Sequence, residues 1–153
     1  MLQECMKLQP NIKVEHPYSD GLRLGDYIWI SGQLPLDLKT GKIVEGSMRE
    51  QTEQAMKNIR EVLKYYELCM EHLMRVTIYI TNMSQYDVMN DVYTSCFKKT
   101  FPARSVVGVS SLPYGALIEI EAYAMDTRAL EVLCSGEECC EDENGCCITE
   151  GKK

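Results

Sequence analysis

Two amphipathic helices with a strand between them restrict what this chain can fold into. Apolar side chains recur at three- and four-residue steps in residues 52–66 and again in residues 88–97, which is the spacing of one face of an α-helix. Residues 74–81 instead alternate and are rich in β-branched side chains, a pattern typical of a strand. One fold must therefore combine a sheet with at least two helices.

Both helices begin with a sequence signal for an N-terminal cap. Ser47 is followed three residues later by Glu50, and Ser84 by Asp87. In this pattern the serine and the acid each satisfy a backbone N–H of the first turn. The dipeptide before Ala103 ends in Pro102, which predicts the end of the second helical region because the residue before a proline disfavours helical backbone.

Four further segments read as strands, in two pairs. Residues 22–24 and 27–30 flank a Gly-Asp turn, and residues 104–111 and 116–125 flank a turn with Pro and Gly. Each pair is expected to form a hairpin, and residues 1–20 are expected to be irregular or to form a short edge strand. The order hairpin, helix, strand, helix, hairpin predicts an α+β fold: one mixed β-sheet with two helices on one face. The other face keeps apolar residues, which predicts a homo-oligomer.

Charge and length limit the classes of function. The 153 residues are expected to form one domain, residues 1–128, followed by an acidic tail, residues 129–153. From Glu131 onward seven acids and two lysines leave a balance of −5 out of a total of −7. No basic stripe suited to phosphate backbones is present, so nucleic-acid binding is disfavoured. No membrane-length apolar run or signal peptide is found, and a cytoplasmic location is the default expectation.

Five of the eight cysteines crowd into the tail. Their Cys-Cys dipeptides are not the spaced pairs of a zinc ribbon, although thiolates with neighbouring acids could bind a soft metal. The acidic composition favours instead an extension without fixed structure. The cysteines concerned are Cys134, Cys139, Cys140, Cys146 and Cys147.

Arg104 is the strongest candidate for a functional residue. It follows a proline and stands where an apolar strand begins, and its planar guanidinium is always charged and matches a carboxylate. Read from the residues alone, it is either an anion receptor or one half of a structural salt bridge with Glu119 or Glu121. His16 and His72 are too few and too far apart for a zinc site or a histidine-based triad.

A series of segments in the right order resembles the RidA family, also called YjgF/YER057c-like proteins. Together they span roughly residues 15–126, and the most specific is Phe101-Pro102-Ala103-Arg104-Ser105. The others are Pro17-Tyr18-Ser19, Ser31-Gly32-Gln33-Leu34-Pro35, residues 54–58, Asn90 with Val92-Tyr93, Leu112-Pro113 and Ile118-Glu119-Ile120-Glu121-Ala122.

The resemblance implies a homotrimer with a cleft at each subunit interface and a fold similar to chorismate mutase of the bacillus type. It implies hydrolysis of 2-aminoacrylate and related 2-imino acids to 2-oxo acids and ammonia, without a cofactor. Arg104 would bind the substrate carboxylate through a bidentate pair, and Glu119 would position or activate the attacking water. The residues that would line the cleft and orient the substrate are Tyr18, Ser31, Gly32 and Asn90.

Two questions stay open at the level of the sequence. Burial would raise the pKa of Glu119 and a nearby arginine would lower it, and the sequence does not say which effect is larger. Many relatives carry cysteine two residues after the arginine, where this chain has Val106, so the proposed chemistry must work without that thiol. The alternative functions attached to the family are a regulatory protein that binds metabolites or proteins without turnover, and an RNA-cleaving translation inhibitor.

Overall fold

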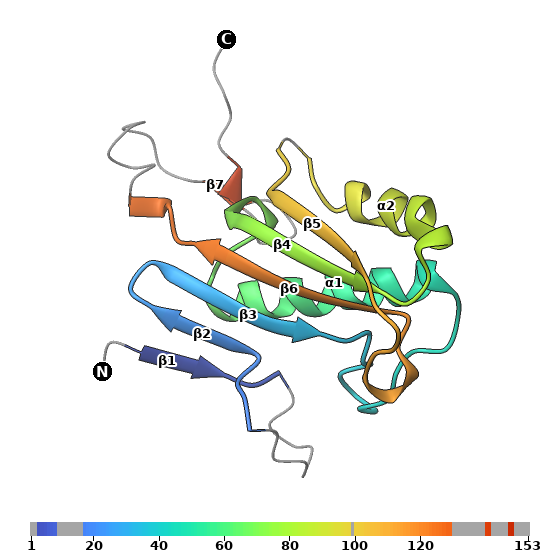
Figure 1. The fold of residues 1–153 in the computed structure, drawn as a ribbon. Helices are drawn as coiled ribbons and strands as arrows, with labels where there is room; N and C mark the ends of the chain where they lie inside the picture. The colour runs from blue at the N-terminus through green and yellow to red at the C-terminus, as the bar shows by residue number, and fades with distance from the viewer. Residues whose placement is uncertain (1–2, 9–16, 99, 130–139, 142–146, 149–153) are drawn as a thin grey trace.

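A six-stranded mixed sheet forms the body of the protein, as Figure 1 shows. The computed structural model describes residues 3–8, 17–98, 100–129, 140–141 and 147–148. Its strand order is β1-β2-β3-β6-β4-β5, and all neighbours are antiparallel except β4 and β5. The strands are β1 (Gln3–Met6), β2 (Gly21–Leu24), β3 (Tyr27–Gln33), β4 (Leu73–Ile80), β5 (Ala103–Gly108) and β6 (Ile118–Met125).

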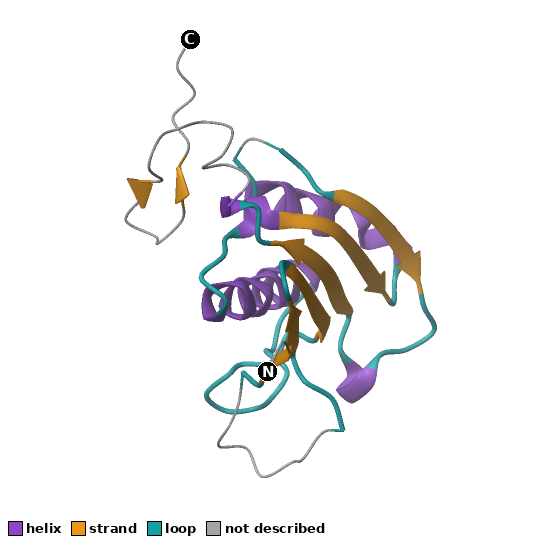
Figure 2. Cartoon of the chain, turned by 90° about the vertical axis from the view of Figure 1, so that its left-hand side faces the viewer, coloured by secondary structure: helices purple, strands orange, loops and turns teal. Residues whose placement is uncertain are grey.

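Helices α1 (Met48–Tyr65) and α2 (Tyr86–Ser95) lie on one face of this sheet, as Figure 2 shows. Alternate residues of the central strands point into the layer between helices and sheet; Ile78 and Ile120, for example, are fully buried. The predicted α+β architecture is thus confirmed. Three single 3₁₀ turns, Met70–His72, Met83–Gln85 and Pro113–Gly115, complete the connections.

The start of α1 follows the capping pattern of the sequence. The Ser47 backbone N–H donates to Glu50 Oε2 at 2.7 Å, and the Arg49 N–H donates to Ser47 Oγ at 3.2 Å. Met48 and Thr52 on the apolar stripe are fully buried. A cap of this kind stabilises a helix by about 1 kcal/mol.

The start of α2 differs from the prediction. Asn82 Oδ1 accepts from the Ser84 backbone N–H at 3.0 Å and from the Ser84 hydroxyl at 2.8 Å. Asn82 therefore caps the preceding 3₁₀ turn, and Ser84 with Asp87 does not cap the helix, which begins at Tyr86. The physical reason is that asparagine is at least as good a cap as serine and stands two residues earlier.

Only the first predicted hairpin forms. β2 and β3 pair around Gly25, whose φ of 61° suits glycine. The second hairpin was a wrong prediction, because β5 pairs parallel with β4 while β6 lies between β3 and β4. In the central position β6 has a neighbouring strand on each side, and these strands flank its apolar side chains. The N-terminal segment Gln3–Met6 forms the short edge strand that was one of two alternatives.

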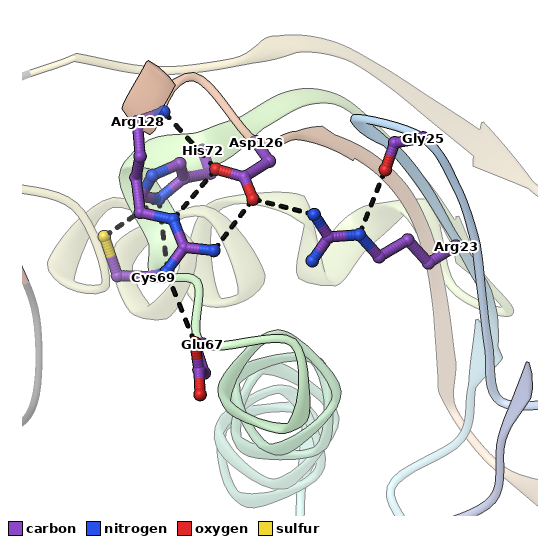
Figure 3. Close-up of polar contacts among 7 residues, drawn as sticks. All are labelled: Arg23, Gly25, Glu67, Cys69, His72, Asp126 and Arg128. Atoms are coloured by element: carbon purple, nitrogen blue, oxygen red, sulfur yellow. Dashed lines mark hydrogen bonds and ion pairs between the residues drawn. The ribbon is translucent and has the colours of Figure 1, made fainter. Parts of the chain in front are cut away.

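Asp126 ties the end of β6 to the rest of the body, and Figure 3 shows this clamp. Its carboxylate accepts from Arg23 Nη2 at 2.9 Å and from Arg128 Nη2 at 2.8 Å and Nε at 2.9 Å. Arg128 Nη1 also lies 3.5 Å from a Glu67 oxygen beyond α1. The hydrogen bond from the Arg128 side chain is the largest of the influences that lower the pKa of Asp126 to about 2, against the opposing effect of burial.

The neighbouring turn holds His72 in a structural role. The Cys69 backbone N–H donates to His72 Nδ1 at 3.2 Å, and both residues are buried. Figure 3 draws this pair beside the Asp126 clamp. His16, the other histidine, lies outside the described residues.

Beyond Ala129 the structure describes only two short paired strands, β7 (Cys140–Glu141) and β8 (Cys147–Ile148). Cys134, Cys139 and Cys146 lie outside the described residues. Among the residues that are described, no three His, Cys, Asp or Glu side chains gather as metal ligands would. None of the described helices has the length and apolar character needed to cross a membrane.

Replacing Asp126 by asparagine tests the clamp. The folded-state pKa of Asp126 lies near 2, below its ordinary 3.8, so its charge stabilises the fold above about pH 4 and this stabilisation disappears as pH falls toward 2. After allowance for solvent screening, Asp126→Asn should lower the free energy of unfolding by about 1–2 kcal/mol at neutral pH. Urea unfolding at pH 7 and at pH 2 should give a difference from wild type that is lost at pH 2. The exposed Asp91 provides the control Asp91→Asn, and equal losses at both pH values would contradict the assignment.

Candidate functional site

Arg104 projects from β5 toward α2. It stands opposite Val76 of β4, whose side chain is buried under the helices, so both side chains lie on the helix-covered face of the sheet. Arg104 Nη2 donates to Asn90 Oδ1 at 2.8 Å and to the Tyr86 hydroxyl at 3.2 Å. The Tyr93 ring lies beneath the guanidinium, with Cζ 4.4 Å from the ring centroid. Since these three residues of α2 recur at four- and three-residue steps, one helix face holds the arginine.

The other terminal nitrogen of Arg104 has no partner. Nη1 is buried and makes no hydrogen bond with any described residue. The acceptors on Nη2 are an amide oxygen and a hydroxyl, so no carboxylate of the described part of the chain neutralises this charge. A buried donor left unpaired costs about 1–3 kcal/mol. Arg104 therefore has the geometry of an anion receptor rather than of a structural ion pair.

Glu119 lies on the opposite face of the sheet. It stands in β6 opposite Tyr79, between the buried residues Ile118 and Ile120. Gly32 of β3 approaches its side chain so closely that an added Cβ would lie 2.8 Å from Glu119 Cδ and would overlap Oε1. Gly32, one of the residues expected to line the cleft, therefore leaves room for this carboxylate.

The surroundings of Glu119 raise the pKa of its carboxyl group. Burial is the larger cause, and the charge of Glu121 adds to it. Glu121 itself accepts a hydrogen bond from the Tyr79 hydroxyl at 3.1 Å. Arg104 is not among the influences, because the sheet separates the two side chains. Within one chain, burial thus decides the question that the sequence left open.

Tyr18 and Ser31 border the same region as Glu119. The Ser31 hydroxyl donates to the Ser19 carbonyl at 2.7 Å, which fixes the loop that carries Tyr18. Burial, Asp20, Tyr114 and Glu119 raise the pKa of Tyr18, in that order of size. Tyr114, which the sequence did not single out, has a φ of 56° and is highly exposed, a conformation that side chains other than glycine rarely adopt.

The predicted residues thus form two groups. The arginine site consists of Arg104 with Tyr86, Asn90 and Tyr93. The glutamate site consists of Glu119 with Gly32, Ser31 and Tyr18. The expectation that Glu119 stands on the strand next to Arg104 was wrong, because β4 lies between β5 and β6. Two strand spacings, about 10 Å, and the thickness of the sheet separate the sites within one chain.

Tyr86 and Tyr93 are the contacts that the sequence reading missed. A signal was present, because both stand on the helical stripe of Asn90, which was predicted to orient the substrate. Val106, two residues after Arg104, packs against the core from the same side of the sheet. It offers an apolar side chain where many relatives were expected to carry a thiol.

Comparison with known proteins assigns the body of the chain to a family. The family model described as Endoribonuclease L-PSP matches residues 8–126. A RutC family protein of Pyrococcus horikoshii is 42% identical over 108 residues, which cover 71% of this chain and 86% of the relative. The 2-iminobutanoate/2-iminopropanoate deaminase of Homo sapiens is 36% identical over 109 residues, covering 71% of this chain and 80% of that protein.

Solved structures agree with the sequence matches. The crystal structure of a protein of the conserved Rid family from Yersinia pestis is 37% identical and superposes with a TM-score of 0.75. The match covers 80% of this chain and 98% of the Yersinia pestis chain. The six-stranded sheet with its two helices is thus the fold of that family.

Adding one methyl group at Gly32 tests the glutamate site. In Gly32→Ala the new Cβ overlaps the carboxylate of Glu119, so the carboxylate must move, and overpacking should lower the free energy of unfolding by about 1–3 kcal/mol. Moved out of its half-buried position, Glu119 should titrate with a pKa closer to its ordinary value. Carboxyl-carbon NMR titration measures this, with the low pKa of Asp126 as an internal reference. An unchanged pKa of Glu119 in a folded Gly32→Ala protein would contradict the close approach.

Proposed function

This chain belongs to the RidA family, whose family model is described as Endoribonuclease L-PSP, and we propose that it hydrolyses 2-imino acids to 2-oxo acids and ammonia. The human relative that is 36% identical is named 2-iminobutanoate/2-iminopropanoate deaminase. Substrates of that kind carry a carboxylate next to a C=N carbon. This chemistry needs one cationic group that binds the carboxylate of the substrate and one carboxylate that positions or activates the attacking water.

One observation carries the proposal: Arg104 is held in place by neutral groups and keeps an unpaired, buried donor. Asn90 and Tyr86 fix Nη2, while Nη1 has no partner among the described residues. A carboxylate at this position would form charge-assisted hydrogen bonds, which are about twice as strong as neutral ones. The arginine site therefore favours ligands that carry a carboxylate.

Glu119 supplies the base. In the proposed reaction a water oxygen bonds to the imine carbon while Glu119 accepts a proton from that water. That proton passes to the nitrogen and gives an intermediate with a hydroxyl and an amino group on the same carbon. Glu119 next accepts the hydroxyl proton as the C=O bond forms and delivers it to the nitrogen as the C–N bond breaks, so ammonia leaves and a 2-oxo acid remains. The raised pKa of Glu119 suits this cycle, because a base is most effective when its pKa is close to the working pH. The imine carbon is itself electrophilic, so the addition of water needs no cofactor.

The two sites meet in the proposed assembly only when two copies of the chain join. Arg104 lies on the edge strand β5, and Glu119 lies on the face of the sheet opposite the described helices α1 and α2. That face also exposes Tyr27, Trp29 and Tyr123, by 57%, 37% and 42%. Contiguous exposed aromatic side chains mark an interaction surface. A homotrimer with a cleft at each subunit interface would cover them and bring Arg104 of one copy to Glu119 of the next.

RNA cleavage is the second candidate, because the matching family model is described as an endoribonuclease. The net charge of −7 disfavours it, since RNA binding depends on basic side chains and weakens steeply with salt. Purified protein that cleaves RNA in a manner that Arg104→Ala and Glu119→Gln both abolish would favour this function over deamination.

Replacing Arg104 by alanine tests the deaminase proposal. Without the guanidinium the substrate loses its charge-assisted hydrogen bonds, and kcat/KM for 2-iminopropanoate should fall by about 10²-fold or more. The measurement couples a dehydratase that generates the imine to detection of 2-oxo acid or ammonia. The exposed Arg60 on α1 provides the control Arg60→Ala, which removes the same charge away from both sites. Turnover in Arg104→Ala equal to that of Arg60→Ala would overturn the assignment.

A further inference from the structure

The hydrogen bonds of Arg104 limit how it can hold a carboxylate. A guanidinium grips a carboxylate at two points either with one hydrogen from each terminal nitrogen or with Nε and Nη2. Both hydrogens of Nη2 are already engaged, one by Asn90 and one by the Tyr86 hydroxyl. Nη2 takes part in both two-point arrangements, so neither of them can form. Nη1 remains as the terminal nitrogen without a partner among the described residues. A second donor must come from elsewhere.

The Tyr86 hydroxyl meets the requirements for that donor. Its oxygen accepts from Nη2 at 3.2 Å, and its own proton has no acceptor among the hydrogen bonds of the described residues. Since the two terminal nitrogens share one carbon, the Tyr86 oxygen and Nη1 lie within about 6 Å of each other. Two donors at that separation can each reach one oxygen of a single carboxylate.

Neighbouring tyrosines do not offer the same combination. The Tyr93 hydroxyl is also buried without a partner, but its side chain is only 2% exposed and its ring lies beneath the guanidinium. An incoming anion would have to displace the core to reach it. Tyr86 and Arg104, in contrast, are both only partly buried as residues, although the Nη1 atom itself is covered in the single chain.

We propose that the Tyr86 hydroxyl is a substrate-binding group that donates the second hydrogen bond to the carboxylate held by Arg104. The inference rests on the proposed function and adds to it a residue that sets specificity for carboxylates. Accepting from Nη2 aligns the hydroxyl, and its proton then points to the anion. The arginine and the tyrosine thus bind the acid as one unit.

Binding of a stable acid measures this role without turnover. 2-Oxobutanoate, titrated calorimetrically into the intact protein, presents the carboxylate of the proposed product. Tyr86→Phe keeps the ring and removes only the hydroxyl, and the affinity should fall about tenfold through loss of one hydrogen bond to a charged group. The control Tyr65→Phe makes the same change on an exposed tyrosine of α1 and should leave the affinity unchanged. Equal affinities for Tyr86→Phe and Tyr65→Phe would overturn the role of Tyr86.

Fluorination separates a donor to the substrate from an acceptor that merely positions Arg104. A ring fluorine makes a phenol a stronger hydrogen-bond donor and a weaker acceptor. Tyr86→3-fluorotyrosine should therefore bind 2-oxobutanoate more tightly than wild type, and unchanged or weaker binding would overturn the proposal. The variant Arg104→Ala distinguishes a failure of the proposed deaminase function from a failure of the proposed role of Tyr86. If it binds the acid as wild type does, the proposed function fails; if it loses binding while Tyr86→Phe keeps it, only the role of Tyr86 fails.

Discussion

The position of β6 between β3 and β4 determines where the candidate residues lie. A central strand must place its apolar side chains under the helices, and Ile118 and Ile120 do so. Because side chains alternate along a strand, Glu119 is forced onto the uncovered face, beside Gly32. β5 is left at the edge, where Arg104 turns toward α2. One pairing choice thus separates Glu119, the proposed base, from Arg104, the proposed anion-binding residue, and leaves each at a surface that a second copy of the chain could complete.

Two other arginines of the molecule show how a structural arginine is paired. Arg23 and Arg128 both donate to the carboxylate of Asp126 at 2.8–2.9 Å, and Arg128 also pairs with Glu67 at 3.5 Å, so the two positive charges face two carboxylates of the same chain. Among the described residues, Arg104 finds neutral acceptors alone, and its buried Nη1 finds no partner. An uncompensated charge at a partly buried position is unfavourable for stability. Such an arrangement is expected where the missing anion is a ligand.

Local features of the sequence predicted most of the local structure, although the cap expected at Ser84 does not start α2. The capping box at Ser47 and the turn at Gly25 depend on residues within a few positions, and both form as expected. Gly32 was expected to line the cleft, although its contact with Glu119 was not foreseen. Strand order was not predictable in the same way, because a β5–β6 hairpin and the observed crossover satisfy the same alternation of side chains. Tyr86 was missed because it contacts Arg104 only where α2 packs beside β5, and the sequence does not show that these two elements meet.

Arg104 and Glu119 can act on one substrate only if they come from different copies of the chain. Mixed assemblies of Arg104→Ala and Glu119→Gln, each inactive alone, measure this directly. In the proposed trimer each cleft takes Arg104 from one copy and Glu119 from the next. After random equimolar mixing, about one quarter of the clefts contain both intact residues. Turnover of about that fraction of wild type is expected in mixed trimers verified by native mass spectrometry. No recovery of 2-iminopropanoate hydrolysis in verified mixed trimers would contradict this expectation.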